Sequence, residues 1–275
     1  MSAGAPGSPD FGQTAADYGR FRAGFPEELV DRLDALGVLG PDDRALDVGT
    51  GTGTLARLLA PRVDSMVGTD PAEAMLGQAR ELGGPSNLTY EVGVAERTGF
   101  ADEAFELVTA GQCWHWFDRP RAAAELSRVL VPGGHLVIAH FDWIPLPGNV
   151  VEATEALIRE YNPEWAMGGG TGLYPAWLAD VAGAGLEEIE TFSFDLGAPY
   201  SHEAWVGRIR ASAGVGASLP DERVRSFSAD LTELLAARFP EEPLSVHHRT
   251  WALVATKPGR VVPRRRGEHG PGGGP

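Results

Sequence analysis

Short apolar runs alternate with amphipathic segments along the first half of the chain. The apolar runs have the length and the glycine or acidic flanks of strands, and they lie at 44–48, 63–70, 88–94, 105–110 and 135–141. Between them, apolar positions recur at helical spacing, as in 55–59, 71–79 and 120–130, and a further amphipathic helix is predicted around 27–36. Strands separated by helices indicate βαβ units, so the pattern predicts an α/β fold with a doubly wound, mostly parallel sheet.

The regular alternation stops at Asp142, where prolines and a glycine follow. Beyond that point the pattern predicts helices at 150–161, 177–184, 202–211 and 221–239, and strands at 186–194 and 245–256. We expect a single domain over 13–257. Both ends, 1–12 and 258–275, are rich in glycine and proline and are predicted to be disordered.

Composition and charge limit the partners and the cellular location that we expect for this protein. The net charge of −15 argues against a nucleic-acid partner, because phosphates would be repelled. Cys113 is the only cysteine, so no intrachain disulfide is possible. The start of the chain lacks the pattern of a secretory signal, and no apolar run is long enough to span a bilayer. We therefore expect a cytoplasmic protein without a membrane partner, and the oligomeric state stays open.

A glycine-rich turn follows the first predicted strand, in the sequence LDVGTGTG at 46–53. A strand, a glycine turn and a helix together let the backbone approach a nucleotide-like ligand closely. A dinucleotide fingerprint, G-x-G-x-x-G, would place its third glycine at Thr54, whereas here it arrives at Gly53. The spacing therefore disfavours an NAD-dependent oxidoreductase, which remains an alternative.

Asp70 closes the second predicted strand, about 20 residues after the first glycine of the turn. A carboxylate at this distance reaches the ribose hydroxyls of a bound nucleotide in such folds. The alternative role is a helix N-cap before Pro71, and the two roles are compatible.

Four segments resemble the class I S-adenosylmethionine-dependent methyltransferases in order and spacing. They are LDVGTGTG at 46–53, VGTD at 67–70, VGVAERTGF at 92–100 and RVLVPGGHLVI at 128–138. The segment 18–26 further resembles the opening of a methyltransferase type 11 subgroup that includes trans-aconitate methyltransferase-like enzymes. The resemblance implies a seven-stranded, Rossmann-like sheet that ends in a reversed strand pair. It also implies a cofactor-binding half at 14–141, a helical substrate cap from 142–240 over the carboxyl edge, and a last strand at 245–256.

The resemblance also implies residues for binding S-adenosyl-L-methionine. The turn would face the methionine part, with Asp47 near its ammonium group unless Asp47 is only a turn acid. Tyr18 and Arg22 would close over the cofactor, or form a surface cluster. Val94 stands where many relatives carry an acid for adenine. The complete set of expected contacts is Tyr18, Arg22, Asp47, Gly49, Thr50, Gly51, Asp70, Pro71, Met75, Ala95, Glu96 and Gln112.

An aromatic run, Trp114-His115-Trp116-Phe117, follows the fourth predicted strand at the edge where open α/β sheets bind ligands. Aromatic faces suit a sulfonium cation. His115 is the first candidate for a general base or an acceptor-orienting group, and His140 is the second. The alternative is that the aromatic residues belong to the core. The expected substrate pocket comprises Trp114, His115, Trp116 and Trp143.

Metal binding is not expected, because no group of cysteines, histidines and acids has zinc-like spacing. The predicted activity is methyl transfer from S-adenosyl-L-methionine to a small-molecule acceptor, with O-methylation of a carboxylate or hydroxyl ahead of C- or N-methylation. A cyclase that uses the cofactor without methyl transfer is the alternative within the same family.

Overall fold

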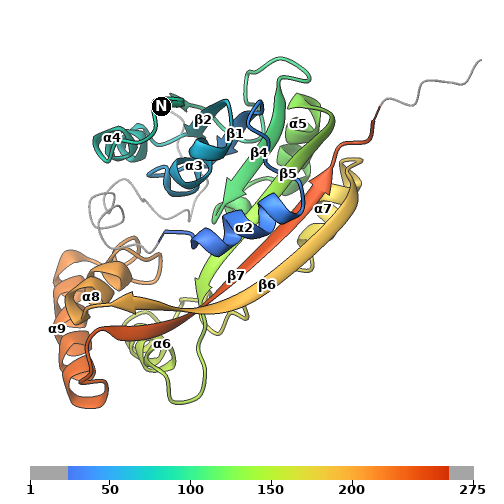
Figure 1. Cartoon of the computed structure of the whole chain (residues 1–275). Coiled ribbons are helices and arrows are strands. Elements are labelled where there is room, and N and C mark those ends of the chain that lie inside the picture. Colours follow the sequence, from blue (N-terminus) through green and yellow to red (C-terminus); the bar gives the residue numbers. More distant parts are fainter. Residues whose placement is uncertain (1–23, 260–275) are drawn as a thin grey trace, which may run out of the picture.

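The computed structural model of the chain describes residues 24–259 (Figure 1). Tyr18 and Arg22 lie outside the described residues, as do 1–12 and all but the first two residues of 258–275, the two ends predicted to be disordered. No helix within the described part is both long and apolar enough to cross a membrane.

Seven strands form one sheet in the order β3-β2-β1-β4-β5-β7-β6. The strands are β1 (Arg44–Val48), β2 (Ser65–Asp70), β3 (Leu88–Val92), β4 (Phe105–Gly111), β5 (Leu130–Trp143), β6 (Glu187–Tyr200) and β7 (Leu244–Thr256). The first five pair in parallel, and β7 runs antiparallel to both β5 and β6. The predicted doubly wound α/β fold with a reversed final strand pair is thereby confirmed.

The segment 131–134 falls between the predicted helix at 120–130 and the predicted strand at 135–141, but in the structure it is part of β5. Phe105 pairs with Leu130 while Leu107 pairs with His135, so the intervening residues bulge out of the ladder. Lys257 holds this bulge, because its amide donates to the Gly134 carbonyl and its ammonium group donates to the Leu130 carbonyl. Contacts with the end of the last strand, more than 120 residues away, therefore override the local turn signal.

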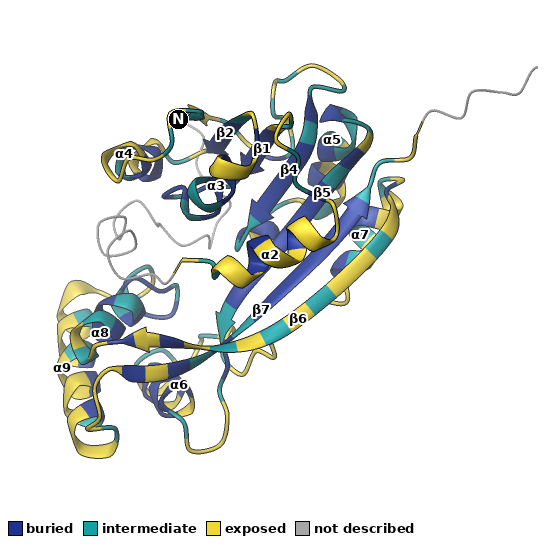
Figure 2. Ribbon diagram, in the orientation of Figure 1, coloured by how far each residue is buried: buried dark blue, intermediate teal, exposed yellow. Residues whose placement is uncertain are grey.

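Helices cover both faces of the sheet (Figures 1 and 2). They are α2 (Glu27–Ala35), α3 (Thr54–Leu59), α4 (Glu73–Glu81), α5 (Arg119–Val129), α6 (Val150–Tyr161), α7 (Trp177–Gly183), α8 (His202–Arg210) and α9 (Asp221–Arg238). Successive strand residues face opposite sides. Val137 accordingly packs in the core with α2 and α3, whereas Ile138 packs in the core with α5 and α7.

A third core lies among α6, α8, α9 and the far ends of β6 and β7. Figure 1 shows these helices beyond the carboxyl ends of the central strands. The Trp205 indole of α8 donates to the Thr154 hydroxyl of α6 at 3.0 Å, and both side chains are fully buried. Buried polar groups need such partners, so this bond fixes α8 against α6. The arrangement encloses the space at the carboxyl edge of the sheet.

Candidate functional site

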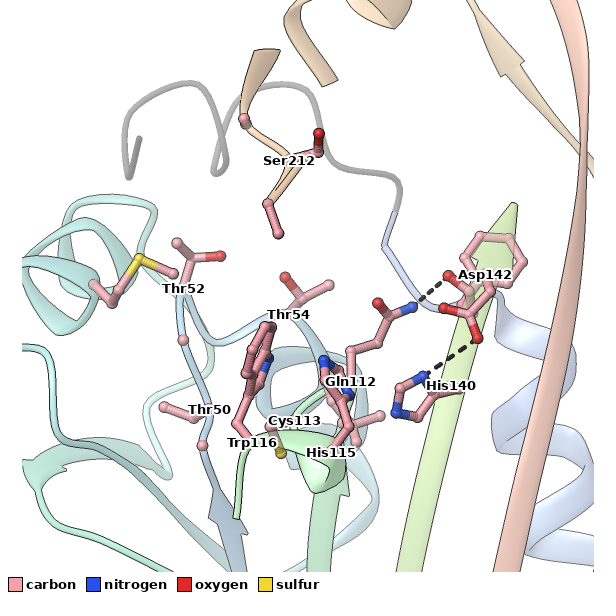
Figure 3. Close-up of a pocket in the computed structure, with 18 of the residues that line it drawn as sticks. Thr50, Thr52, Thr54, Gln112, Cys113, His115, Trp116, His140, Asp142 and Ser212 are labelled. Carbon is pink, nitrogen blue, oxygen red and sulfur yellow. Dashed lines mark hydrogen bonds and ion pairs between the residues drawn. The ribbon is translucent and has the colours of Figure 1, made fainter. Parts of the chain in front are cut away.

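A cavity of 1040 Å³ lies at the carboxyl edge of the sheet (Figure 3). Its walls come from the loops after β1, β2, β4 and β5, and from the segment at and after the end of α8. Open α/β sheets bind their ligands at this edge, where the strand order reverses. The cavity is therefore the candidate active site.

The glycine turn after β1 lines one end of the cavity. Gly49, Gly51 and Gly53 have φ of 62°, 56° and 77°, the left-handed region that glycine adopts without a Cβ penalty. A Cβ at Gly51 would lie 3.4 Å from the Met75 methyl group, an ordinary van der Waals contact, so the positive φ and not a clash is what favours glycine here. The turn thus leaves its main chain open to a close ligand.

Asp47 lies two residues before the first glycine of this turn, and its side chain is buried. Its two oxygens accept hydrogen bonds from the Thr50 and Thr109 hydroxyls, both at 2.6 Å. Burial raises the pKa of Asp47 to about 6, although the two hydroxyls act in the opposite direction; the nearby Asp70 adds to the rise. Asp47 is thus both an acid that braces the turn and a buried group at the cavity wall.

Asp70 bridges two loops. Its Oδ2 accepts a hydrogen bond from the Gly51 amide at 3.0 Å, and its Oδ1 accepts one from the Ala72 amide at 2.9 Å. Burial raises the pKa of this carboxyl, and the two amide bonds lower it. Ala72 is the N-cap of α4, so Asp70 stabilises the entry to the helix without capping it itself. Each carboxylate oxygen retains acceptor capacity for a ligand. Pro71 and Met75, also predicted, line the same cavity.

Two of the expected cofactor contacts, Ala95 and Glu96, are not among the residues that line the cavity. Ala95 is buried in the core beside α5, and Glu96 accepts a hydrogen bond from the Asp118 amide at 2.9 Å. β3 ends at Val92, two residues earlier than predicted, and Val94 then forms an isolated bridge with Arg97. The role of Ala95 and Glu96 in binding the cofactor stays a prediction.

The aromatic loop divides between core and cavity. Trp114 is fully buried, and its indole donates to Asp180 at 3.2 Å, so it is a core residue and not the predicted pocket residue. His115 and Trp116 do line the cavity, with ring centroids 4.4 Å apart. The loop forms a short 3-10 turn, Trp114–Trp116, in which successive side chains point in different directions. One tryptophan is thereby buried while the next two residues face the cavity.

Gln112 connects the ends of two strands. Its side chain donates to the Phe141 carbonyl of β5 (Figure 3), and its backbone φ of 61° is unusual for a residue other than glycine. Such a conformation persists only where the surroundings enforce it, and it is common at functional sites. Gln112 lines the cavity as predicted.

His140 forms the polar centre of the cavity floor. Its ring is buried, its Nδ1 lies 3.3 Å from Asp142 Oδ2, and its Nε2 is buried with no hydrogen-bond partner among the described residues. Tyr174 donates its hydroxyl proton to the same Asp142 oxygen at 2.7 Å. In the tautomer whose Nδ1–H donates to Asp142, Nε2 is an acceptor nitrogen. The array is therefore built like an oriented base.

Asp142 and Tyr174 were not predicted as site residues. Asp142 stands two positions after His140 on one strand, and residues two apart share a face. The spacing alone could therefore have predicted that the two side chains lie close together. Tyr174 comes from a loop 32 positions from Asp142. Its ring stacks on Trp177 at 4.0 Å with an interplanar angle of 9°, which only the folded chain reveals.

The opposite wall of the cavity carries a second group of polar side chains. The Trp143 indole donates to Glu155 at 3.1 Å, and the Arg208 guanidinium lies over the Trp143 ring at 4.7 Å. Trp143 was a predicted pocket residue and lines the cavity. Glu155 and Arg208 were missed, because they lie in helices whose sequence carries no motif. Within residues 24–259, no group of three or more histidines, cysteines or acids is arranged to hold a metal ion.

Comparisons with known proteins agree with this geometry. Residues 46–138 match the model of a family described as a methyltransferase domain. An uncharacterized methyltransferase of Mycobacterium tuberculosis is 36% identical over 156 residues, which are 57% of this chain and 62% of that protein. One of Schizosaccharomyces pombe is 27% identical over 223 residues, 80% of this chain and 84% of that protein. The match thus spans less than two thirds of the mycobacterial relative.

A solved structure extends the likeness to the whole fold. The putative type II methyltransferase of Anaeromyxobacter dehalogenans is 25% identical and superimposes with a TM-score of 0.59, covering 86% of this chain and 97% of that one. The matched family segment runs from β1 into β5 and includes the glycine turn, Asp70 and the aromatic loop. Residues 46–138 are therefore similar to a methyltransferase domain, and the chain has the fold of the class I enzymes that use S-adenosyl-L-methionine as their cofactor.

Proposed function

We propose that this chain transfers the methyl group of S-adenosyl-L-methionine to an oxygen atom of a small-molecule acceptor. One observation carries the proposal: a single cavity joins the glycine turn and Asp70 at one end to the buried His140–Asp142 pair on its floor. A cofactor site and an oriented base thus open into the same enclosed space.

The residues at the first end fit the cofactor. Gly51 leaves room at the main chain, and Asp70 retains acceptor capacity for two ribose hydroxyls. Asp47 would supply negative charge beside the ammonium group, since a cation removed from water needs such a partner. When bound, the cofactor supplies a methyl group already activated by the positive sulfur.

The acceptor end holds and deprotonates the nucleophile. Asp142 fixes the His140 ring, and the unprotonated Nε2 would accept the proton of an acceptor hydroxyl. A carboxylate acceptor would need no base, so His140 would only orient it. Tyr174 and Trp177 pack against the His140 ring with centroids at 4.5 and 5.0 Å, and this packing limits its motion. Holding the reacting atoms in line supplies much of the rate in such a displacement.

The segment at 18–26 resembles the trans-aconitate methyltransferase-like subgroup, and this resemblance keeps carboxylates among the proposed acceptors. A hydroxyl acceptor draws its support from the His140–Asp142 pair instead. Both are O-methylations, and the chemical stability of the product tells them apart, because a methyl ester is cleaved by mild base whereas a methyl ether is not.

Methyl transfer is tested with the purified full chain and S-adenosyl-L-methionine carrying a labelled methyl group. Incubation with small acids, phenols and metabolite extracts should produce a labelled small molecule whose mass has increased by one CH₂ group. A converted substrate of unchanged mass would instead indicate a cyclase. Binding of NAD in place of the sulfonium cofactor would indicate an oxidoreductase, and either result would contradict the proposal.

A further inference from the structure

Arg208 is the only arginine or lysine among the described residues that line the cavity. It belongs to α8, and its side chain is partly exposed, so that it borders the cavity directly. The acids of the lining include Asp47, Asp70 and Glu73 at the cofactor end. A lone cation on the opposite wall therefore gives the cavity two electrostatically different ends.

No carboxylate of residues 24–259 forms an ion pair with this guanidinium. Burial lowers the pKa of Arg208, whereas its electrostatic interactions with Tyr200 and Asp142 and a hydrogen bond with Tyr200 act in the opposite direction. Arginine nonetheless stays protonated in proteins, so a full positive charge is kept at the wall.

Glu155 is an acid that lines the same cavity, and its carboxylate already accepts hydrogen bonds from other groups. Its oxygens accept hydrogen bonds from the Trp143 indole at 3.1 Å, the Arg159 guanidinium at 3.0 Å and the Gly169 amide at 2.7 Å. Arg159 thus neutralises Glu155, and the acid charge that acts on Arg208 is that of Asp142. A cation that is partly withdrawn from water gains stability when a ligand supplies a directly paired counter-charge.

Two features shape what Arg208 can bind. Trp143 occupies the face of the guanidinium at 4.7 Å, whereas the hydrogen-bond donors of an arginine project in its plane. Ser212, four positions further along and just beyond the end of α8, lines the cavity with a buried hydroxyl that has no partner among the described residues. A planar oxyanion matches this geometry, because a carboxylate accepts two parallel bonds from arginine and a third from a hydroxyl.

We propose that Arg208, with Ser212, binds a carboxylate group of the acceptor and thereby positions the acceptor in the cavity. This inference rests on the proposed function and adds the substrate class, an organic acid with an apolar body. The apolar body is expected from Trp116, Trp165 and Met167, which line the same cavity. A single guanidinium next to Asp142 and Glu155 suits one negative charge better than the two of a phosphate monoester.

The alternative partner of Arg208 is the carboxylate of the cofactor. If the glycine turn of β1 holds the methionine part of the cofactor, that carboxylate would lie away from Arg208, because Trp143 ends β5, two strands from β1. Strands are spaced by about 4.8 Å, so the two ends lie roughly 10 Å apart along the sheet. Cofactor affinity then distinguishes the two assignments.

The test measures binding to the protein saturated with S-adenosylhomocysteine, so that turnover is not needed. The probes are matched acids and amides: indole-3-acetate with indole-3-acetamide, 4-hydroxybenzoate with 4-hydroxybenzamide, and octanoate with octanamide. We expect the wild-type protein to bind at least one acid about tenfold more tightly than its amide. Arg208→Met should abolish that preference, Arg208→Lys should keep part of it, and Ser212→Ala should reduce it.

Arg223→Met is the matched control, because Arg223 also lies over an aromatic ring, that of Tyr161 at 5.4 Å, but outside the cavity. It should keep the full acid preference, and every variant should bind S-adenosylhomocysteine as the wild type does. Equal binding of acids and amides, no binding of any acid, or a loss of S-adenosylhomocysteine affinity in Arg208→Met would overturn the inference. An acid preference without any methyl transfer would instead contradict the proposed function and leave the carboxylate site standing.

Discussion

The Gly51 amide donates a hydrogen bond to Asp70 Oδ2 at 3.0 Å, which joins the loop after β1 to the loop after β2. A positive φ at Gly51 turns its amide toward this carboxylate, and the second oxygen of Asp70 holds the entry to α4. The two groups that the sequence separates by 19 positions are thus one preformed unit. A ligand bound there meets loops that need little further ordering.

Asp70→Asn should weaken binding of S-adenosylhomocysteine at least about tenfold, because a neutral amide lacks the charge and one acceptor oxygen that the ribose hydroxyls would use. Isothermal titration calorimetry measures the affinity. Glu81→Gln is the control, since Glu81 is an exposed residue at the other end of α4. Unchanged affinity in Asp70→Asn would remove Asp70 from the cofactor site.

Asp47 should make both stability and cofactor binding depend on pH. Burial raises the pKa of Asp47 from 3.8 to about 6, so the folded protein takes up a proton that the unfolded chain has lost in this range. The contribution of Asp47 to stability is therefore complete below about pH 4 and lost as the pH rises through about 6. Asp47→Asn has no such loss, so its stability relative to wild type should increase by up to about 3 kcal/mol between pH 4 and pH 7.5.

The same group should release a proton when the cofactor binds. A neighbouring ammonium group favours the carboxylate, so binding at pH 6 should release a fraction of a proton in wild type and less in Asp47→Asn. Calorimetry in two buffers that differ in ionisation enthalpy measures this release. Equal proton release in the two proteins would show that Asp47 does not face the ammonium group.

His140→Gln should reduce kcat for a hydroxyl acceptor by a factor of about 10² to 10⁴, the usual range for loss of a general base. Asp142→Asn should lower kcat less, because it disturbs only the orientation of the ring. Affinity for S-adenosylhomocysteine should stay unchanged in both. His115→Gln is the comparison, since His115 is exposed and its ring centroid lies 5.4 Å from that of His140. A larger loss in His115→Gln than in His140→Gln would reverse the two roles.

Trp114→Ala should destabilise the protein by about 3–5 kcal/mol, because it removes a fully buried indole and leaves a cavity. Trp116→Ala should change stability by less than about 1 kcal/mol, because 42% of that side chain is exposed, and should alter acceptor affinity instead. Urea unfolding of both variants gives the comparison. Similar stability losses in the two would contradict the division between core and cavity.

The cofactor half was largely predictable because its signals are local. The glycine turn, the strand that ends in Asp70 and the aromatic loop are each encoded within a few consecutive residues, and the alternation of strands and helices predicts the sheet edge where they meet. Helix α6 was likewise predicted with its observed bounds, from Val150 to Tyr161, since its apolar spacing is regular.

The features that the sequence did not predict depend on long-range contacts or on the local backbone conformation. The segment 131–134 forms a bulge in β5, because Lys257 donates hydrogen bonds to its ends. Trp114 and Trp116 are neighbours in one aromatic run, but a 3-10 turn buries the first and exposes the second. Arg208 contacts the Trp143 ring, 65 positions away, only when α8 packs beside β5, and no local sequence pattern encodes that contact. Its proposed role as a carboxylate site therefore could not be predicted from the sequence.

The central claim is that the glycine turn and Asp70 bind the sulfonium cofactor, and titration of S-adenosylhomocysteine into wild type and Gly51→Ala tests it directly. Gly77→Ala is the matched control, because Gly77 lies in α4 with no atom within 4 Å of an added Cβ. The account predicts one bound nucleoside per chain in wild type and Gly77→Ala, and strongly reduced binding in a folded Gly51→Ala. Full affinity in Gly51→Ala, or binding of NAD in place of S-adenosylhomocysteine by the wild type, would contradict it.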